Sequence, residues 1–199
     1  MNKKLIIASQ NKHKIEEFQK ILSKYGFEVC GRDDAGLPKD DVVEDGRTFE
    51  ENSLIKAKAI FDMANTATLA DDSGLCVDFL GGSPGIYSAR FAGDNANDAQ
   101  NNEKLLTLLL DAKDEQRSAK FVCVITLILQ DGEKIVARGE CNGKIQRAET
   151  GENGFGYDPL FIPDGYTVSM AELPPEEKNQ ISHRAKAIEK LVEILSKKL

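Results

Sequence analysis

The sequence contains only two histidines, His13 and His183, which excludes a zinc site built from several imidazole ligands. Its four cysteines are far apart and form no CxxC pair, so we interpret them as reduced thiols of the core. No GxxxxGK[ST] motif occurs, which excludes a P-loop. No Ser-His-Asp or Cys-His combination is ordered convincingly for nucleophilic catalysis.

An excess of positive charge and long apolar segments are also missing. Lys and Arg number 26 against 33 Asp and Glu, giving a formal net charge of -7. Affinity for nucleic acid comes mainly from neutralising phosphates, so we expect no nucleic-acid partner, although a local basic cluster can still bind a free nucleotide. The first residues contain only the short apolar run LIIA, and no segment approaches the length of a membrane span. We therefore expect a cytoplasmic protein.

The length and the order of predicted elements indicate the fold class. With 199 residues, 41% of them hydrophobic, the chain can bury a core as one domain over residues 1–199 with room for two lobes. A first strand, Leu5 to Ala8, precedes a predicted helix that stops at Gly26. The apolar stripe of that helix comprises Ile15, Phe18, Ile21, Leu22 and Tyr25. Strands and helices go on alternating, which predicts an α/β fold with a mixed sheet.

A second helix should begin at Thr48, because Thr48 and Glu51 have the spacing of a capping box. Its predicted apolar face comprises Leu54, Ala57, Phe61 and Ala64. Asn52 and Lys56, four residues apart, share another face. The runs from Thr68 to Ala70 and from Leu75 to Leu80 then read as two short strands.

Turn-forming residues, GGSPG, follow at 81–85, and a leucine-rich helix predicted to open near Asp98 looks like ordinary core. The runs from Phe121 to Leu129 and from Lys134 to Cys141 predict antiparallel strands joined at Asp131-Gly132. A last helix is predicted from about Ser182.

Two polar segments have the residue types of a phosphate site. The loop SQNKHK precedes a helix, where backbone N–H groups and Lys12 and Lys14 suit an anion, although such loops are also common on surfaces. The tetrapeptide Asp71-Asp72-Ser73-Gly74 can hold a hard cation and activate water, or can simply form a capped turn. Glu44 and Glu51 are the upstream acids that can complete a magnesium site.

Two further segments have groups that suit a nucleobase. In GFGYDP, from Gly154 to Pro159, an aromatic ring can stack on a base and exposed backbone can read its edge, unless the aromatics are buried in a turn. Ser182-His183-Arg184 opens the last helix, where both basic side chains can donate to a carbonyl or a phosphate, although a histidine at a helix start is more often a surface or capping residue.

In chain order, the segments SQNKHK, TFEENSLIKAKA, LADDSGLCVDFLGGSPGIYSARFAG, GFGYDPLF and EEKNQISHRAKA closely resemble the inosine triphosphate pyrophosphatase family. The resemblance spans nearly the whole chain. It implies an elongated α/β fold in which a long mixed sheet is flanked by helices and two lobes surround a central cleft. It also implies a homodimer and a requirement for Mg²⁺.

Residue by residue, the resemblance implies a triphosphate loop, a catalytic acid and a base-binding strip. Asp72 corresponds to the catalytic acid, which also binds the metal with Glu44. The substrate-binding residues implied are Ser9, Gln10, Asn11, Lys12, His13, Lys14, Lys56, Ser73, Phe155, Gly156, Tyr157, Asp158, Lys178, His183 and Arg184. The chain departs from the family at Gln10, where glycine is common, and at Val43, where an acid often precedes Glu44.

The activity implied is hydrolysis of ITP, dITP and XTP to the monophosphate and pyrophosphate. Lys178, His183 and Arg184 resemble the groups that read the 6-keto edge of the purine. A fixed donor there stays unpaired against the amino group of adenine, which explains rejection of ATP. A Maf-type pyrophosphatase acting on modified pyrimidines and a regulator that binds nucleotides without catalysis are the alternatives.

Overall fold

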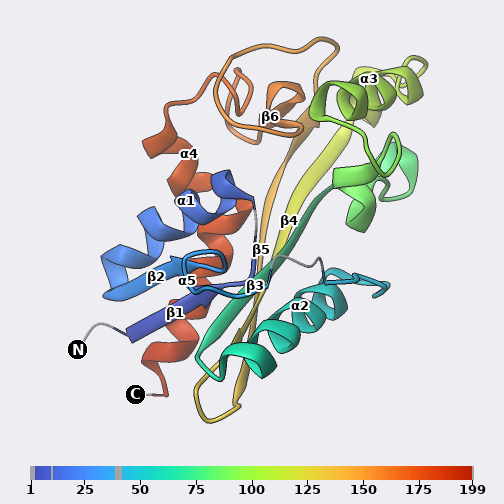
Figure 1. Cartoon of the computed structure of the whole chain (residues 1–199). Coiled ribbons are helices and arrows are strands. Elements are labelled where there is room, and N and C mark those ends of the chain that lie inside the picture. Colours follow the sequence, from blue (N-terminus) through green and yellow to red (C-terminus); the bar gives the residue numbers. More distant parts are fainter. Residues whose placement is uncertain (1–2, 10, 39–41, 199) are drawn as a thin grey trace. The chain divides into compact units, whose positions relative to one another are not determined.

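The computed structural model describes residues 3–9, 11–38 and 42–198 (Figure 1). Within them, six strands form one mixed sheet in the order β2-β1-β3-β4-β5-β6. The strands are β1 (Lys3–Ile7), β2 (Phe27–Gly31), β3 (Thr68–Val77), β4 (Ser118–Ile128), β5 (Lys134–Ile145) and β6 (Phe161–Pro163). The α-helices are α1 (Lys12–Leu22), α2 (Phe49–Ala64), α3 (Asp98–Leu108), α4 (Pro175–Ile181) and α5 (His183–Ser196). The predicted α/β class with a mixed sheet is confirmed.

The chain divides into two compact units. Unit 1 comprises Met1–Asp72, Cys123–Gly139 and Arg184–Leu199, and unit 2 comprises Ser73–Val122 and Glu140–His183. Strands β3, β4 and β5 contribute residues to both units. Each unit has its own hydrophobic core, and the single domain and the central cleft remain predictions.

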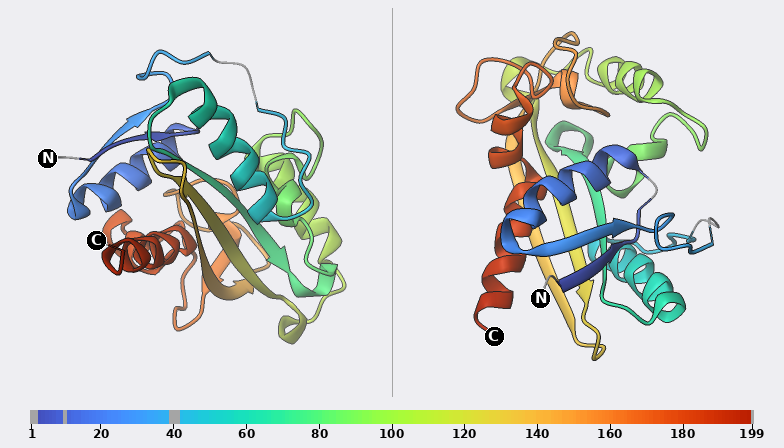
Figure 2. Two further views of the ribbon diagram at one scale, coloured as in Figure 1. Left: turned by 90° about the horizontal axis from the view of Figure 1, so that it is seen from below. Right: turned by 60° about the vertical axis from the view of Figure 1, so that its left-hand side comes forward.

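In unit 1, helices cover both faces of the sheet, because successive side chains of a strand point to opposite faces. Leu5 and Ile7 of β1 belong to a core cluster with residues of α1 and α5. Ile6 and Ala8 pack with residues of α2 instead. Figure 2 shows α1 and α5 on one side of the strands and α2 on the other. β1 pairs in parallel with both β2 and β3.

Helix α1 lies where the sequence predicts it. Asn11 caps its N-terminus, and Gly26, at a φ of 78°, follows the short 3₁₀ turn Ser23–Tyr25 that ends it. Phe18, Ile21 and Leu22 are buried as expected. The placement of Tyr25 in the apolar stripe is wrong, since this residue is 44% exposed. The α-helical period stops at Leu22, so the side chain of Tyr25 no longer follows the stripe.

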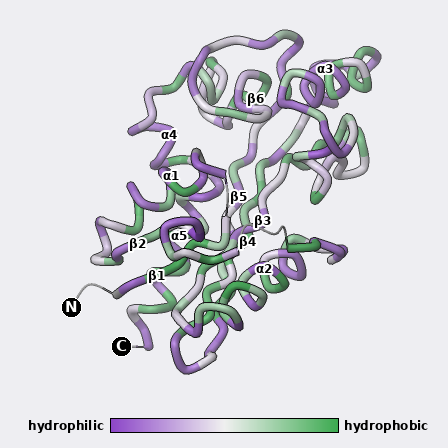
Figure 3. Tube along the Cα trace, viewed as in Figure 1, coloured by the Kyte–Doolittle hydropathy of each residue, from purple (hydrophilic) through white to green (hydrophobic). Residues whose placement is uncertain are grey.

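The predicted start of α2 is confirmed, because the Thr48 side chain accepts a hydrogen bond from the backbone N–H of Glu51. Its predicted apolar face is only partly right: Ala57 is buried, but Leu54 is half-buried. The buried side of α2 includes the polar residues Asn52 and Ser53. Hydropathy alone misplaced this face, since hydrogen-bonding partners allow polar side chains to be buried. Figure 3 shows hydrophilic and hydrophobic residues alternating along the helices.

β3 runs without interruption from Thr68 to Val77, so two short strands separated by a turn are the wrong interpretation of this segment. Asp71 and Asp72 lie inside the strand, and Gly74 continues it with no positive φ. Buried carboxylates in a strand need charged or hydrogen-bonding partners. Those partners are supplied by α1, α2 and α5 within unit 1, and no sequence pattern shows them.

In unit 2, α3 begins after Asn97, which caps it with a reciprocal hydrogen bond to Gln100. Leu105 and Leu109 are buried, but Leu110 is 72% exposed and Leu108 is also exposed, so the leucine cluster is only half core. Helix α3 ends at Leu108, and the leucines that face away from unit 2 stay on its surface.

The strands predicted on either side of Asp131-Gly132 and the last helix are present, whereas β2 and β6 were not predicted. β4 and β5 are neighbours in the sheet, and the turn between them contains Gly132 at a φ of 85°, as predicted from Asp131-Gly132. Helix α4 was not predicted. Cys123 and Cys141 are buried in the cores of unit 1 and unit 2, whereas Cys30 and Cys76 are only half-buried. In the described part of the chain, each helix is too short or too polar to cross a membrane.

Candidate active site

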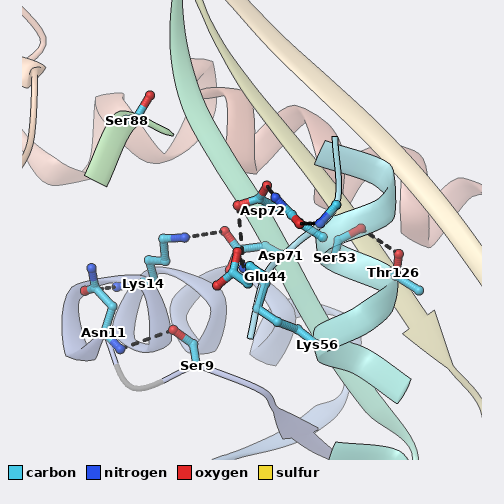
Figure 4. Close-up of polar contacts among 12 residues, drawn as sticks. Ser9, Asn11, Lys14, Glu44, Ser53, Lys56, Asp71, Asp72, Ser88 and Thr126 are labelled. Carbon is cyan, nitrogen blue, oxygen red and sulfur yellow. Dashed lines mark hydrogen bonds and ion pairs between the residues drawn. The ribbon is translucent and has the colours of Figure 1, made fainter. Parts of the chain in front are cut away.

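The loop after β1 is organised by its own side chains. Ser9 Oγ accepts a hydrogen bond from the backbone N–H of Asn11 over 3.2 Å. Asn11 Oδ1 in turn accepts from the backbone N–H of Lys14 over 3.2 Å, which caps α1 (Figure 4). Lys12 lies exposed in the first turn of the helix. The loop therefore presents lysines and the N-terminal end of α1, which together suit an anion.

Two predicted residues of this loop carry no structural account. Gln10 lies outside the described residues, and of His13 only the backbone, in α1, is described. Their predicted contacts with the triphosphate therefore stay predictions.

Asp71 is the centre of a buried charge cluster on the α1 and α5 face of β3. Lys14 Nζ lies 2.9 Å from Asp71 Oδ2, and Arg184 Nη2 lies 3.7 Å from the same oxygen. Arg184 is also paired with Glu17 of α1, and its guanidinium lies 5.5 Å from the centre of the Phe18 ring. Arg184 thus has acidic partners within unit 1, an arrangement different from the purine-reading role implied by the family resemblance.

Asp72 points to the α2 face, where Asn52 and Lys56 contact it. Asn52 Nδ2 donates a hydrogen bond to Asp72 Oδ2 over 3.1 Å. Lys56 Nζ lies 3.5 Å from Asp72 Oδ1 and 3.1 Å from Glu44 Oε2 (Figure 4). The structure therefore brings together Asp72, Lys56 and Glu44, as the sequence predicts. Glu51, the other upstream candidate, accepts a hydrogen bond from the backbone N–H of Arg47 instead.

The environments of the two aspartates shift their pKa values in opposite directions. Burial by itself raises the pKa of Asp71, but Lys14 and Arg184 outweigh it and hold that pKa well below its ordinary value. Burial raises the pKa of Asp72, and the nearby positive charge of Lys56 does not fully compensate. Neighbouring carboxylates with diverging pKa values mark acid and base roles in many active sites. Asp71 is thus the fixed anion, and Asp72 is the carboxylate better suited to accept a proton.

Lys56 remains charged between its acidic neighbours. Burial lowers the pKa of Lys56, but Asp71, Asp72 and Glu44 together raise it above its ordinary value. The carboxylates of Asp72 and Glu44 therefore both lie within ion-pair distance of one cation, the ammonium group of Lys56. This arrangement has the charge and the oxygen donors that a hard divalent cation prefers.

The residues fit magnesium bound together with a substrate better than a metal held by protein alone. In residues 3–9, 11–38 and 42–198, no three His, Cys, Asp or Glu side chains are grouped to hold a metal ion. Mg²⁺ usually takes one or two carboxylates plus waters and substrate phosphates. Glu44 and Asp72 are the two carboxylates that could hold it here.

In unit 2, the GFGYDP segment forms a turn organised by Asp158. The Asp158 carboxylate accepts a hydrogen bond from the backbone N–H of Phe155 over 3.0 Å and pairs with Lys178 Nζ at 2.8 Å. Lys178 Nζ also lies 4.8 Å from the centre of the Phe155 ring. A Cβ at Gly154 would lie 2.2 Å from Asp158 Oδ2, so only glycine fits there. Phe155, Asp158 and Lys178 are thereby brought together, with Asp158 in a supporting position.

The other two residues of the strip are held by neighbouring elements. Asp98 Oδ2 accepts a hydrogen bond from the backbone N–H of Gly156 over 2.6 Å. Asn102 Nδ2 donates to the carbonyl of Gly156 over 3.1 Å. Tyr157 is buried in the core of unit 2, and its hydroxyl donates to the carbonyl of Ser88 over 2.8 Å. The structure thus gives Tyr157 a core position, while Phe155 and Gly156 stay partly exposed.

The remaining predicted residues lie next to the positions in the sequence where the chain passes from one unit to the other. Ser73, half-buried, is the first residue of unit 2 on β3. His183 is buried and stacks on the Phe121 ring at 4.9 Å between centres. His183 belongs to unit 2, whereas Arg184 belongs to unit 1. The residues predicted to bind phosphate therefore lie in unit 1, and those predicted to bind the base lie mainly in unit 2. Their joint action on one nucleotide remains a prediction.

Sequence reasoning missed several residues that hold the site in place. Asn52 contacts Asp72, Glu17 contacts Arg184, and Asp98 holds Gly156. A signal was present for Asn52, because it lies four residues before Lys56 and therefore on the same face of α2. The other two give no local signal, since their partners are distant in sequence.

Lysines that can neutralise phosphate charge and carboxylates that can bind a metal ion are the groups that enzymes use to hydrolyse phosphate anhydrides. The chain belongs to the Ham1 family, whose model matches residues 5–194. A dITP/XTP pyrophosphatase of Clostridium perfringens is 49% identical over 95% of both chains, and one of Oceanobacillus iheyensis is 47% identical over 95% of this chain and 96% of its own. The resemblance inferred from the sequence is confirmed.

Solved structures agree with this assignment. The Staphylococcus aureus Ham1 protein superposes with a TM-score of 0.86 at 44% identity, covering 99% of this chain and 100% of its own. A Ham1 protein from Coxiella burnetii gives a TM-score of 0.87 at 40% identity, covering 98% and 99%. The fold of this chain is therefore that of the Ham1 proteins.

Proposed function

We propose that this chain is a nucleoside triphosphate pyrophosphatase that hydrolyses dITP, ITP and XTP to the monophosphate and pyrophosphate. The observation that carries the proposal is the cluster in which Lys56 lies within ion-pair distance of both Asp72 and Glu44. The related proteins named dITP/XTP pyrophosphatases, at 45–49% identity, support the choice of substrate.

The lysines and carboxylates divide the work of the reaction. Lys14 and Lys56 bind the phosphate chain and stabilise the negative charge that develops on it. Asp72 orients a water and accepts its proton, a role that suits a carboxylate whose pKa is raised by burial. The water oxygen bonds to the α-phosphorus while the bond from that phosphorus to the bridging oxygen breaks. Pyrophosphate leaves with the electrons of that bond, and the proton rests on Asp72.

Glu44 and Asp72 are the residues that would hold Mg²⁺. When bound, this ion supplies charge neutralisation on the phosphates and makes the leaving group more stable. Asp71 stays ionised beside Lys14 and Arg184 and keeps both cations in place. This arrangement explains why adjacent acids occur in a site for an anionic substrate.

The base-binding strip of unit 2 supports a preference for 6-keto purines. Phe155 is half-buried and its ring centre lies 4.8 Å from Lys178 Nζ, so an aromatic ring that can stack on a base and a hydrogen-bond donor lie together. An ammonium group donates hydrogen bonds and accepts none, so it pairs with a keto oxygen and not with the amino group of adenine. We assign discrimination against ATP to this mismatch.

The test is the release of pyrophosphate, measured separately from orthophosphate, from dITP, XTP, dGTP and ATP with and without magnesium. Magnesium-dependent pyrophosphate from dITP and XTP, with little from dGTP or ATP, is the expected result. Release of orthophosphate, or equal rates on all four, would overturn it. Activity confined to modified pyrimidine nucleotides would favour a Maf-type enzyme, and binding without turnover would favour a regulator.

We also propose that the protein acts as a homodimer in the cytoplasm on both ribose and deoxyribose nucleotides. The family resemblance supports the dimer, and the acidic composition and short apolar runs support the location. Light scattering after gel filtration tests the dimer, and a mass equal to one chain would contradict it. Paired assays with ITP and dITP test the tolerance of both sugars.

A further inference from the structure

The side chain of Asn52 joins two separate parts of the proposed site. This residue is 1% exposed on α2. Its Nδ2 donates to Asp72 Oδ2 over 3.1 Å, and its Oδ1 accepts a hydrogen bond from the backbone N–H of Gly46 over 2.9 Å. Both ends of a buried amide are therefore used, one on the strand that carries Asp72 and one on the loop that carries Glu44.

The contact with Asn52 leaves no room for a side chain at Gly46. A Cβ on Gly46 would lie 2.6 Å from Asn52 Oδ1, 2.8 Å from Glu51 Cβ and 3.0 Å from the backbone nitrogen of Asn52. Real Cβ atoms essentially never come within 3.0 Å of another heavy atom, as this one would to Asn52 Oδ1 and Glu51 Cβ, so any larger residue would push the loop away from α2. The loop reaches Asn52 because residue 46 has no side chain.

The contact also fixes the orientation of the catalytic carboxylate. With Oδ2 bound to Asn52, Oδ1 is the Asp72 oxygen that lies 3.5 Å from Lys56 Nζ. Glu44, two residues before Gly46, reaches the same ammonium group at 3.1 Å. Glu44 and Asp72 come from different segments of the chain, so a contact between these segments is needed to keep both carboxylates facing one cation.

We propose that Asn52 is a positioning residue that sets the rotation of Asp72 and anchors the Glu44 loop through Gly46. The inference rests on the proposed function for its catalytic consequence. Its structural half, a tie between the loop and α2 through one side chain, stands on the described contacts alone. Asn52 touches no reacting atom and acts through Asp72 and Glu44.

Substitutions can separate the two hydrogen bonds. Asn52→Asp keeps an oxygen that accepts from Gly46 but places a second carboxylate against Asp72 Oδ2. Asn52→Ala removes both contacts. Ser53→Ala is the matched control, because Ser53 is the next residue of α2, is fully buried and bonds Thr126 Oγ1 at 2.8 Å rather than any residue of the site.

Two measurements are made on each full-length variant: hydrogen exchange of the Gly46 amide in metal-free protein, and kcat and KM for dITP with magnesium. Asn52→Ala should speed exchange at Gly46 and lower kcat by about 10–100-fold, the usual effect of losing a second-layer partner of a metal ligand. Asn52→Asp should keep Gly46 protected yet lose a similar factor in kcat. Ser53→Ala should lower stability while leaving Gly46 exchange and kcat unchanged.

The outcomes decide between positioning and simple packing. If Asn52→Ala leaves kcat unchanged, or lowers it no more than Ser53→Ala does, the positioning role is overturned. If the wild-type protein releases no pyrophosphate, the proposed function fails on its own, and Gly46 exchange still decides the tie: protection retained in Asn52→Ala overturns it, and protection lost supports it. A crystal structure of Asn52→Asp with a rotated Asp72 would support the orienting role independently.

Discussion

Asp71 and Asp72 are consecutive residues of β3, yet their carboxylates contact different layers of helices. Asp71 pairs with Lys14 of α1 and Arg184 of α5, whereas Asp72 contacts Asn52 and Lys56 of α2. The cause is the two-residue repeat of a strand, which sends neighbouring side chains to opposite faces. One strand therefore supplies a permanently ionised anchor and a carboxylate of raised pKa side by side.

Substituting Asp72→Asn should lower turnover of dITP by about 100-fold or more, since general-base catalysis contributes at least that much. The same change should stabilise the metal-free protein at neutral pH. Burial raises the pKa of Asp72, so its stabilising contribution exists below the ordinary carboxyl pKa and is lost as pH rises through the raised value. Thermal unfolding in a chelator should show a higher Tm for the variant, with the gain shrinking toward acidic pH.

Asp71→Asn is the matched control and should have the opposite sign. Lys14 and Arg184 hold the pKa of Asp71 below its ordinary value, so its contribution to stability is present at neutral pH and is lost only as pH falls through that low pKa. The variant should unfold at a lower temperature at neutral pH. Shifts of the same sign in both variants would contradict the assignment of the two environments.

Lys56→Met should weaken both binding and folding. The Lys56 side chain is 14% exposed and pairs with Glu44 and Asp72, so its loss leaves the buried Asp72 carboxylate and the half-buried Glu44 carboxylate without their cation, at a cost on the order of 3 kcal/mol. KM for dITP should rise as well. Lys58→Met is the control on the same helix. The Lys58 side chain is 60% exposed and pairs with Asp62, so this substitution should lower the free energy of unfolding by at most about 0.5 kcal/mol. Equal losses of unfolding free energy in urea would refute the distinction.

Substitutions should show that Tyr157 is a core residue and that Phe155 is a substrate contact. Tyr157→Phe leaves the buried carbonyl of Ser88 without its donor and should cost about 1 kcal/mol of stability, with no change in KM for dITP. Phe155→Ala should raise KM about 10-fold, because stacking a base on an aromatic ring is worth about 1–3 kcal/mol. A raised KM in Tyr157→Phe would return Tyr157 to the base-binding strip.

Arg117 should be the most damaging arginine to lose in unit 2. Its buried guanidinium donates to three backbone carbonyls, those of Ile145, Leu109 and Gln146, at 2.7 to 2.9 Å. Arg117→Met should cost several kcal/mol, since each buried acceptor left unpaired costs about 1–3 kcal/mol. Arg147→Met, in an exposed pair with Asp114, should change stability by less than about 1 kcal/mol. Urea unfolding of both variants, read as the midpoint and slope, checks the ranking.

Local patterns were enough to locate most of the elements and the residue types of the site. The capping residues Asn11 and Thr48 stand where loops meet helices. Among the candidate lysines and acids, Lys56 lies within ion-pair distance of Glu44 and Asp72 within unit 1. Capping and helical spacing depend on residues within one turn of each other, so the sequence alone specifies them.

The path of β3 and the burial of individual side chains depended on the tertiary structure. Polar residues Asp71 and Asp72 look like a turn in sequence, but partners from three helices allow them to lie inside a strand. Hydrogen-bonding partners also explain why Asn52 is buried, whereas Leu110, which lies beyond the end of α3, is exposed.

The sequence by itself determined the α/β class, the family and the candidate lysines and carboxylates of the proposed site, because these follow from composition, short spacings and ordered motifs. Only the tertiary structure decided that Asp71 is an anchor, that Asp72 faces Lys56 and Glu44, and that Tyr157 belongs to the core. These outcomes depend on contacts between residues tens of positions apart. Such contacts form only when the whole chain packs, and no local pattern encodes them.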